Sequence, residues 1–393
     1  MNIFVLNPGS SSFKYALYSM TGNEGSFLET QVAKGTLEHS IENPTKESRS
    51  TYSSTSEAVE KVLSHISKDG LPEIKIEAIG CRVVHGGAEF IEPTLITDKV
   101  LPRLLALNDL APLHNPIALE TINLIRGLLP DIPCVAVFDT AFHQTIPLEA
   151  ATYGLPHELC ETQGFRRYGF HGISYRYVSE LLLKQLGCKP DGNRMIVCHL
   201  GSGASVCAIK DGKSVDTSMG FTPTEGLLMG TRCGDIDPGL ILHLMRTNHL
   251  SAERLEETLN HKSGLLGVSG ISADMRDLEA ATLTGNIRAE EALALFAYRV
   301  VKYIGAYSVV LDGLQDLVFT GGIGEHSAMM RDRVCRRLKS IGCLLDPLKN
   351  SQLATVEPLQ ISSAESSVRI WVVQTDEELQ IAREAAVIRC GSE

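Results

Sequence analysis

Glycine-rich loops, each directly after an apolar segment, are the features of this sequence whose residue types best suit chemistry. They span residues 9–12, 201–205 and 320–324. Glycine lets the backbone approach an anion closely, and successive N–H groups of such a loop can converge on one phosphate. A single loop of this kind is more often a tight turn. Three of them, with Lys14 following the first, favour a site for phosphate groups.

The usual nucleotide-binding motifs are incomplete. Residues 212–214 (Gly-Lys-Ser) could end a Walker A loop, but Cys207 stands where that loop needs its first glycine. A dinucleotide G-x-G-x-x-G fingerprint fails twice, because Val206 and Ser327 occupy its final glycine position. The sequence also lacks a complete H-E-x-x-H motif and a G-x-S-x-G elbow. These gaps argue against P-loop, dinucleotide-binding, metalloprotease and serine-hydrolase classes.

Charged side chains stand in or beside other glycine-containing segments. Arg82 and Arg232 could hold a carboxylate or a phosphate, because a guanidinium group donates two parallel hydrogen bonds. Asp139 follows an apolar strand, a common place for an active-site carboxylate, and His171 lies in a loop before a helical segment. Each also has an ordinary structural reading as an ion-paired arginine, a helix cap or a structural histidine.

The segment Thr375–Glu378 supports a structural and a chemical reading together. Thr375 and Glu378 fit a T-x-x-E capping box, which only stabilises the start of a helix. Glu377 is not needed for that box. It would project from the first helical turn, where a carboxylate can bind Mg²⁺ directly or through water.

Alternating strands and helices must position these side chains, which indicates the α/β class. Apolar patterns predict strands at residues 2–7, 13–18, 316–320 and 369–373, and helices near 57–69, 237–247, 289–312 and up to about 388. Residues 196–209 repeat the opening strand–loop–strand pattern about 192 residues later, with Gly9 matching Gly201 and Ser10 matching Ser202. This repeat predicts two domains of similar topology, 1–147 plus 378–393 and 148–377.

Composition limits the classes of partner. A net charge of −11 and a pI near 5.6 disfavour nucleic-acid binding, which needs basic surfaces. The sequence has no secretory signal pattern and no run of about 18 apolar residues, so no membrane span is expected. Ten cysteines without a C-x-x-C pair suit reduced thiols in a cytoplasm.

Nine ordered motifs make the chain resemble the acetate kinases of the acetokinase family, within the actin, hexokinase and Hsp70-like ATPase superfamily. They are Asn7–Lys14, Arg82–Gly87, Leu113–Pro116, Phe138–His143, Tyr168–Gly172, His199–Ser205, Gly230–Asp235, Thr320–Glu325 and Thr375–Glu378. The resemblance implies two duplicated ribonuclease H-like α/β domains around a cleft, in a cytoplasmic homodimer. It also implies reversible transfer of the ATP γ-phosphate to acetate, giving acetyl phosphate and ADP, with Mg²⁺ or alternatively Mn²⁺.

The resemblance further implies a role for each motif residue. In the family pattern Mg²⁺ is bound by Asn7 and Glu377, and acetate is bound by Arg82, Val84, Leu113 and Phe170. The transition state is stabilised by His171 and Arg232, and Asp139 is the acid/base candidate. The nucleotide residues are Lys14, His199, Leu200, Gly201, Ser202, Gly203, Asp274, Met275, Arg276, Gly321, Gly322, Ile323, Gly324 and Glu325.

Physical chemistry favours another role for Asp139. Acetate is already ionised at neutral pH and has no proton to surrender, so we expect Asp139 to orient an arginine or water around Mg²⁺. On this interpretation, Asp139→Asn loses coupling to Mg²⁺-ATP.

Four positions depart from the family pattern, namely Cys81, Ser202, Cys233 and Asp376. Ser202 reaches less far than the usual asparagine, which bears on nucleotide affinity. Cys233 beside Arg232 suggests inhibition by thiol reagents.

Three alternatives stay open from the sequence. A propionate or butyrate kinase is the first, although Val84 favours acetate because relatives that prefer longer acids tend to have a smaller residue there. A pyrophosphate-using relative is the second. A catalytically silent nucleotide-binding scaffold is the third, and the presence of Arg82, His171 and Arg232 disfavours it.

Overall fold

A computed structural model describes residues 1–9, 12–23, 26–39, 51–68, 74–112, 114–353 and 355–391. The chain divides into two compact units. Unit 1 comprises Met1–Phe142 and Asp376–Glu393, and unit 2 comprises His143–Thr375. The domain limits expected from the sequence, 1–147 plus 378–393 and 148–377, stay a prediction.

Unit 1 is built on a seven-stranded mixed sheet of order β4-β3-β2-β1-β5-β7-β6. β1 is the apolar segment that opens the sequence, and its residues after Ile3 are buried on both faces as far as Pro8. It pairs antiparallel with β2 and parallel with β5. The strands are β1 (Asn2–Pro8), β2 (Ser12–Asn23), β3 (Ser26–His39), β4 (Thr51–Tyr52), β5 (Ala78–Val83), β6 (Thr94–Leu95) and β7 (Cys134–Phe138).

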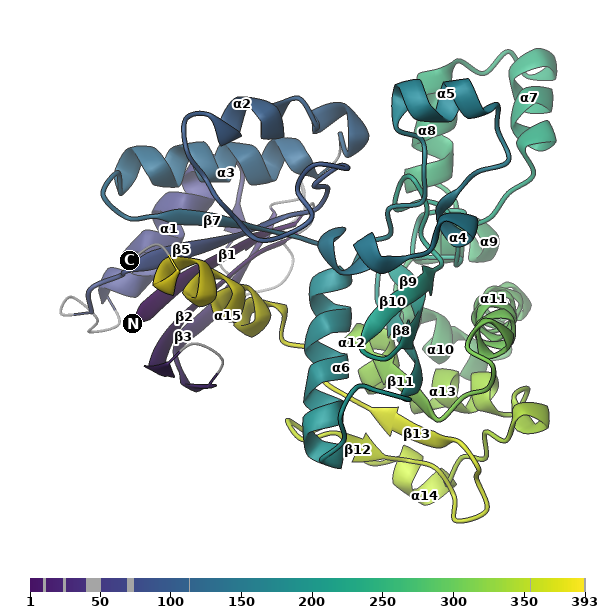
Figure 1. The fold of residues 1–393 in the computed structure, drawn as a ribbon. Coiled ribbons are helices and arrows are strands. Elements are labelled where there is room, and N and C mark those ends of the chain that lie inside the picture. The colour runs from purple at the N-terminus through teal and green to yellow at the C-terminus, as the bar shows by residue number, and fades with distance from the viewer. Residues whose placement is uncertain are drawn as a thin grey trace. The chain divides into compact units, whose positions relative to one another are not determined.

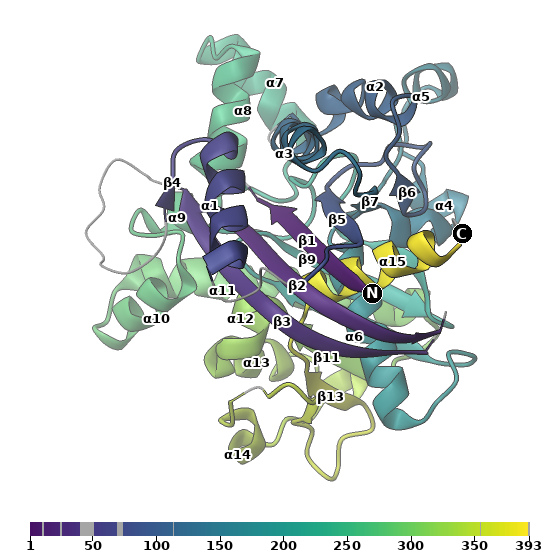
Figure 2. The same cartoon turned by 90° about the vertical axis from the view of Figure 1, so that its left-hand side faces the viewer.

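Helices cover both faces of this sheet (Figures 1 and 2). On one face, α3 packs on β1 and β5 and completes an apolar core with Ile79, Cys81 and Ile122. On the other face, α15 packs across β1, β2, β5 and β7. Gly80 of β5 allows this close approach, because a Cβ atom there would lie 2.7 Å from the Ile381 side chain. The helices are α1 (Thr55–Lys68), α2 (Val100–Leu105), α3 (Asn115–Leu128) and α15 (Glu377–Cys390).

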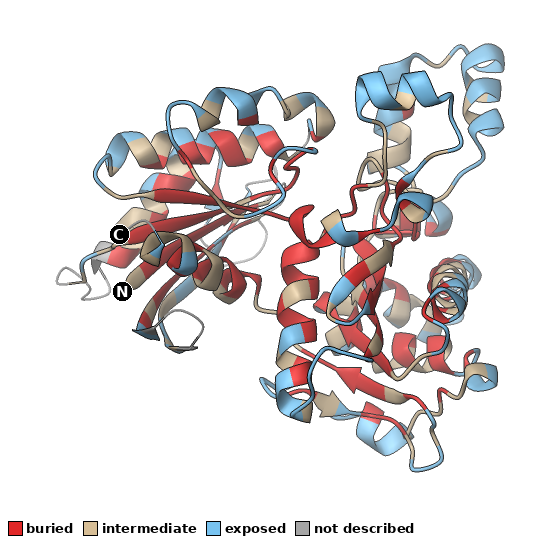
Figure 3. Cartoon of the chain, in the orientation of Figure 1, coloured by how far each residue is buried: buried red, intermediate tan, exposed pale blue. Residues whose placement is uncertain are grey.

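Unit 2 contains a second mixed sheet, of order β10-β9-β8-β11-β13-β12. β8 pairs antiparallel with β9 and parallel with β11, as β1 does with β2 and β5. The predicted repeat is therefore confirmed at the level of topology. Figure 3 shows the central strands of both sheets as mostly buried. The strands are β8 (Arg194–Leu200), β9 (Ala204–Lys210), β10 (Lys213–Thr217), β11 (Asp316–Thr320), β12 (Leu359–Gln360) and β13 (Arg369–Val372).

The helices of unit 2 include α6 and α11, which lie on either side of its sheet (Figure 1). The others surround these two or extend from them. They are α4 (Leu148–Ala151), α5 (His157–Gln163), α6 (Gly172–Leu186), α7 (Pro238–Thr247), α8 (Ala252–His261), α9 (Gly264–Ser269), α10 (Met275–Leu283), α11 (Ile287–Val310), α12 (Gly321–His326), α13 (Ala328–Cys335) and α14 (Pro347–Asn350).

Within the described parts of the chain, α11 is long and apolar enough to cross a membrane by length and composition alone. Core helices of soluble proteins pass the same test. α11 packs on β8 and β9 and on α9, α10 and α13, and Leu293, Phe296 and Val300 are fully buried. It is therefore a core helix of unit 2.

The capping box predicted at Thr375 and Glu378 is wrong. α15 begins at Glu377, and its N-cap is Asp376, whose side chain accepts from the Leu379 N–H. Thr375 Oγ1 instead lies 2.8 Å from Ser174 Oγ. Glu378 turns toward Asn7. Both members of the expected box have partners distant in sequence, which a local pattern cannot reveal.

Candidate active site

The first cluster of predicted residues forms at the end of the β1–β2 hairpin in unit 1. Asn7 and Lys14 are directly opposite each other in the antiparallel ladder, which places their side chains on one face of the sheet. Asn7 is 3% exposed, whereas Lys14 is exposed. Pairing of the two strands thus places the buried amide of Asn7 next to the exposed side chain of Lys14.

Arg82 at the end of β5 joins Asn7 to Asp139. Its Nη2 donates to Oδ2 of Asp139 at 2.6 Å, and its Nε contacts both carboxylate oxygens at 3.2 Å. Its Nη1 donates to Oδ1 of Asn7 at 3.1 Å. Parallel pairing of β5 with β1 and β7 produces this convergence, because all three strands end at the same edge.

Two carboxylates of α15 complete the cluster. Asn7 Nδ2 donates to Glu378 Oε1 at 2.7 Å and to Glu377 Oε2 at 3.3 Å. Both glutamates lie in the first turn of α15, where the helix dipole favours negative charge. Burial acts to lower the pKa of Arg82, but Asp139 and Glu377 outweigh it and raise that pKa above its usual value.

The donor chemistry of this cluster fits Mg²⁺. An amide oxygen and carboxylates are the hard ligands it prefers, and it commonly takes one or two carboxylates together with substrate phosphates and water. Among the described residues, no group of three or more His, Cys, Asp or Glu side chains is arranged to hold a metal by itself. Asn7 and Glu377 would therefore supply part of a coordination shell.

Lys34 and Asp376 flank the acidic end of α15, and sequence reasoning missed Lys34. Its Nζ lies 3.0 Å from Asp376 and 3.2 Å from Glu378. Tyr18 Oη also donates to Asp376. Asp376, the carboxylate that departs from the family pattern, thus forms an ion pair with Lys34. The only signal in the sequence was one basic residue in a polar strand, 342 residues from its partner.

The second cluster forms around the glycine loops of unit 2. The loop after β8 is closed by a hydrogen bond from Gly201 N to Gly203 O at 3.1 Å. The loop predicted at residues 320–324 is instead the start of a short helix, because α12 follows β11 directly and begins at Gly321. Gly321 has a φ of 76°, and a Cβ atom there would lie 2.8 Å from the Leu200 carbonyl oxygen, so this position requires glycine. A Cβ atom on Gly201 would lie 4.0 Å from the Gly322 nitrogen, so the loop after β8 adjoins the start of α12.

His171 and Arg232 meet beside Gly203. A Cβ atom on that glycine would lie 3.5 Å from His171 Nε2 and 3.8 Å from Arg232 Nη1. The segment that carries Arg232 is fixed to the loop by a hydrogen bond from Gly230 N to Ser202 O at 3.0 Å. Burial lowers the pKa of the Arg232 guanidinium. An anion bound beside Gly203 would lie near both His171 Nε2 and Arg232 Nη1.

Other predicted nucleotide residues have structural partners. Asp274 caps α10 and accepts from Arg276 N at 2.8 Å and from Arg276 Nη2 at 2.6 Å. Met275 is 4% exposed. Glu325 Oε1 accepts from Gly321 N at 2.9 Å and from Thr375 N at 3.2 Å, so it ties the first residue of α12 to the segment before α15. His199 and Leu200 end β8, and Ile323 and Gly324 lie in α12.

The apolar residues expected to hold acetate are buried where the structure describes them. Val84 is 4% exposed in unit 1 and Phe170 is 1% exposed in unit 2. Leu113 lies outside the described residues. The Phe170 carbonyl lies 2.9 Å from Nε2 of His143, whose Nδ1 lies 2.8 Å from Ser214 Oγ. His143 therefore fixes the backbone directly before His171.

Burial lowers the pKa of His143 to about 4. In the unfolded chain this histidine binds a proton once the pH falls below its ordinary pKa of about 6.5. In the folded chain it binds a proton only when the pH falls to about 4. Between these two pH values the unfolded state holds more protons, so the free energy of unfolding decreases as the pH falls. We expect the native free energy of unfolding to lose about 2 kcal/mol more than that of His143→Gln between pH 7 and 5. Urea unfolding at both pH values measures this difference. Equal losses in the two chains would contradict it.

The environment of Cys233 argues against the reactivity predicted for it. Burial raises the pKa of its thiol, and Sγ lies 3.1 Å from the Gly234 carbonyl oxygen. All ten cysteines are free thiols, as expected.

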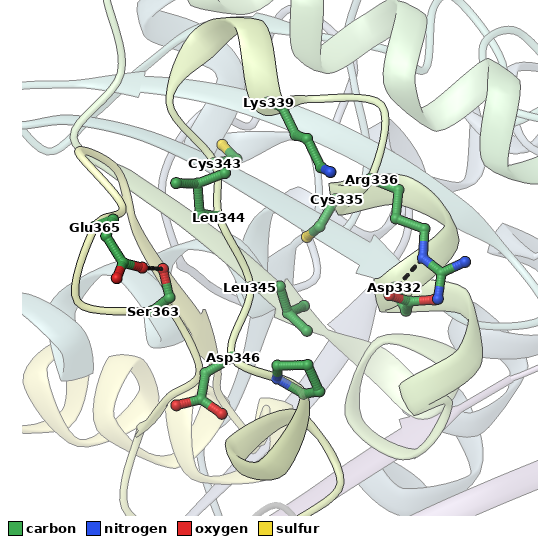
Figure 4. A pocket seen from close by; sticks show the side chains of 11 residues that line it. Asp332, Cys335, Arg336, Lys339, Cys343, Leu344, Leu345, Asp346, Ser363 and Glu365 are labelled. Atoms are coloured by element: carbon green, nitrogen blue, oxygen red, sulfur yellow. Dashed lines mark hydrogen bonds and ion pairs between the residues drawn. The ribbon is translucent and has the colours of Figure 1, made fainter.

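A cavity of about 510 Å³ lies elsewhere in unit 2, between the end of α13 and the start of α14 (Figure 4). None of the predicted site residues lines it. Two of its charged groups have partners within the wall: Arg336 Nε donates to Asp332 at 2.9 Å, and Glu365 accepts from Ser363 at 3.1 Å. The candidate active site is therefore distinct from this cavity.

Comparison with known proteins shows the family of this chain. Residues 2–383 match the acetokinase family. The chain belongs to that family. It is 46% identical to the acetate kinase of Dictyoglomus turgidum, over 98% of this chain and 96% of the relative.

Solved structures of the same family lead to the same result. The acetate kinase of Porphyromonas gingivalis aligns with a TM-score of 0.86 and 41% identity, over 98% of this chain and 99% of the other. A propionate kinase from Francisella tularensis aligns with a TM-score of 0.85 and 38% identity, over the same shares of the two chains. The chain is thus a kinase with a carboxyl group as acceptor, built on the α/β fold of these enzymes.

Proposed function

We propose that this chain catalyses reversible, direct in-line transfer of the ATP γ-phosphate to acetate, with residues of each cluster in separate roles. The observation that carries this proposal is the position of His171 Nε2 and Arg232 Nη1 around Gly203. Phosphoryl transfer depends on positioning and on neutralising charge over the transferring oxygens, which such donors provide.

In this reaction an acetate oxygen attacks the γ-phosphorus, and the bond from that phosphorus to the β-phosphate oxygen breaks. Acetyl phosphate and ADP result. No proton moves, because acetate enters as the anion. Arg82 would pair with the acetate carboxylate, and Asp139 would hold the Arg82 guanidinium in place.

The remaining assignments follow the two clusters. We assign Mg²⁺, or alternatively Mn²⁺, to Asn7 and Glu377; when bound, the ion neutralises phosphate charge. Lys14 and residues 199–203 and 321–325 would bind the nucleotide phosphates, and residues 274–276 would lie on the adenosine side. In unit 1, Lys34 would moderate the negative charge around the metal ligands.

A propionate-preferring enzyme is the second candidate, because the propionate kinase of known structure is nearly as similar to this chain as the acetate kinase. ATP turnover with acetate, propionate and butyrate, and pyrophosphate turnover with acetate, separates the candidates. We expect ATP with acetate to give the highest kcat/KM, by about ten-fold over propionate, since one methylene is worth about 1–3 kcal/mol.

Val84→Ala should move that preference toward propionate by making room for the methylene, with Val83→Ala in the core as a matched control. A native preference for propionate would overturn the acetate assignment. Turnover with none of these acids would overturn the enzyme assignment.

We further propose that the protein is a cytoplasmic homodimer. The supporting feature is α7, an apolar helix in which no residue is buried within the chain. Leu240, Leu242 and Met245 are each at least 40% exposed. Apolar surface of this kind usually marks an interface. Sedimentation of the native chain and of Leu242→Asp tests this proposal, and a native monomer would contradict it.

A further inference from the structure

Two histidine rings of unit 2 stack, and a serine hydroxyl contacts the same nitrogen in each ring. The centroids of His171 and His199 lie 4.2 Å apart, with the ring planes inclined by 21°. Ser205 Oγ lies 2.9 Å from Nδ1 of His171, and Ser174 Oγ lies 2.8 Å from Nδ1 of His199. Both Nδ1 atoms are therefore engaged by side-chain hydroxyls.

Each serine contacts a second hydroxyl in turn. Tyr175 Oη lies 2.5 Å from Ser205 Oγ, and Thr375 Oγ1 lies 2.8 Å from Ser174 Oγ. Tyr175 and Ser205 are both 0% exposed. Burial raises the pKa of Tyr175 well above its ordinary value, so the phenol keeps its proton. A buried phenol donates that proton in a hydrogen bond, and Ser205 Oγ is an acceptor within reach.

We propose that Tyr175 and Ser205 are positioning residues that hold His171 as the neutral tautomer with its proton on Nε2. The Tyr175 O–H donates to Ser205 Oγ, and the Ser205 O–H donates to Nδ1 of His171. Since a neutral imidazole carries one proton, that proton resides on Nε2. This inference rests on the role proposed above for His171.

In this tautomer the Nε2 proton of His171 can be donated to a bound phosphate oxygen. Nε2 of His171 is the ring nitrogen that lies beside Gly203 and near Arg232 Nη1. With the proton on Nε2, the ring donates to a phosphate oxygen at this point. The opposite tautomer would present a lone pair to the same oxygen and repel it.

The backbone of His171 shows that the position of the ring is constrained. His171 has a φ of 59° and a ψ of 22°, in the left-handed region, immediately before α6. This conformation is uncommon for a residue with a Cβ atom and persists where surrounding contacts enforce it. Ser205 and the His199 stack are two such contacts.

Nitrogen-15 NMR of the histidine rings in the full chain tests the proposal, because the two neutral tautomers give different ¹⁵N shifts. His171→Gln identifies the resonances by their loss. We expect the native ring as the Nε2–H tautomer at neutral pH. We expect Ser205→Ala and Tyr175→Phe to give a mixture of tautomers, with kcat about ten-fold lower and KM for ATP nearly unchanged.

Two further variants serve as controls. Tyr168→Phe removes a phenol that donates to the Gly164 carbonyl at 2.9 Å, and it should leave the His171 tautomer unchanged. Ser205→Thr keeps the hydroxyl and should restore the native spectrum. A native Nδ1–H tautomer or imidazolium, or an unchanged spectrum in Ser205→Ala, would overturn the proposal.

These spectra are recorded without turnover, so the two ideas can fail separately. Full activity in His171→Gln would reject the proposed catalytic role of His171 and leave the tautomer result standing.

Discussion

Replacing Arg232 with alanine should lower kcat for phosphoryl transfer by about 10³-fold or more, because an arginine that neutralises the transferring phosphoryl group contributes on that scale. The Arg232 side chain lies beside Gly203 and is partly buried, so water cannot take over its stabilisation of the phosphoryl charge when the guanidinium is removed. KM should change much less than kcat, since the loss falls on the transition state.

Steady-state turnover of ATP with acetate measures this effect, with Arg254→Ala as a matched control on the exposed face of α8. Added guanidinium ions should restore part of the lost turnover in Arg232→Ala and none in the control. Turnover within ten-fold of the native value would remove Arg232 from the catalytic machinery.

The second large effect concerns Asp139. Asp139→Asn should lower kcat/KM for acetate by about 10²-fold, because an amide has one oxygen and cannot accept at both of the positions where Arg82 Nε and Nη2 donate. It should also weaken the coupling to Mg²⁺-ATP, since Arg82 in turn bonds Asn7 beside Glu377.

A double-mutant cycle separates this role from acid/base catalysis. If Asp139 acts through Arg82, the double variant Asp139→Asn/Arg82→Ala should be no slower than Arg82→Ala alone. If the fold losses in kcat/KM of the two single variants multiply in the double variant, Asp139 has an independent part in the chemistry. A native metal dependence in Asp139→Asn would remove its link to the metal site.

The sequence predicted the parts of the fold that depend on local pattern. The strands around residues 2–7 and 316–320 and the repeat of Gly9 at Gly201 were all visible as apolar runs ending in glycine. β3 was missed because it is largely polar and half-exposed, with Leu28 at 72% exposure. An edge-side strand of that kind carries little periodic signal.

The side-chain partners were the least predictable part of the candidate site. Glu378 was assigned to a local cap, yet it bonds Asn7, 371 residues earlier. Ser205 contacts His171 across 34 residues, and no motif linked the two. Such pairs arise only when strands assemble into a sheet, so a single sequence gives the residue types and not the pairing.

The packing of α15 on β1 and β5 has a consequence for biosynthesis. The ribosome synthesises all of unit 2 before it reaches Glu377. One apolar face of the unit 1 sheet therefore stays uncovered while more than two hundred residues are synthesised. Gly80 and its neighbours are exposed to solvent or chaperone during that interval. Because Asn7 gains both of its carboxylate partners from this late helix, a nascent chain cannot complete this cluster before α15 has emerged.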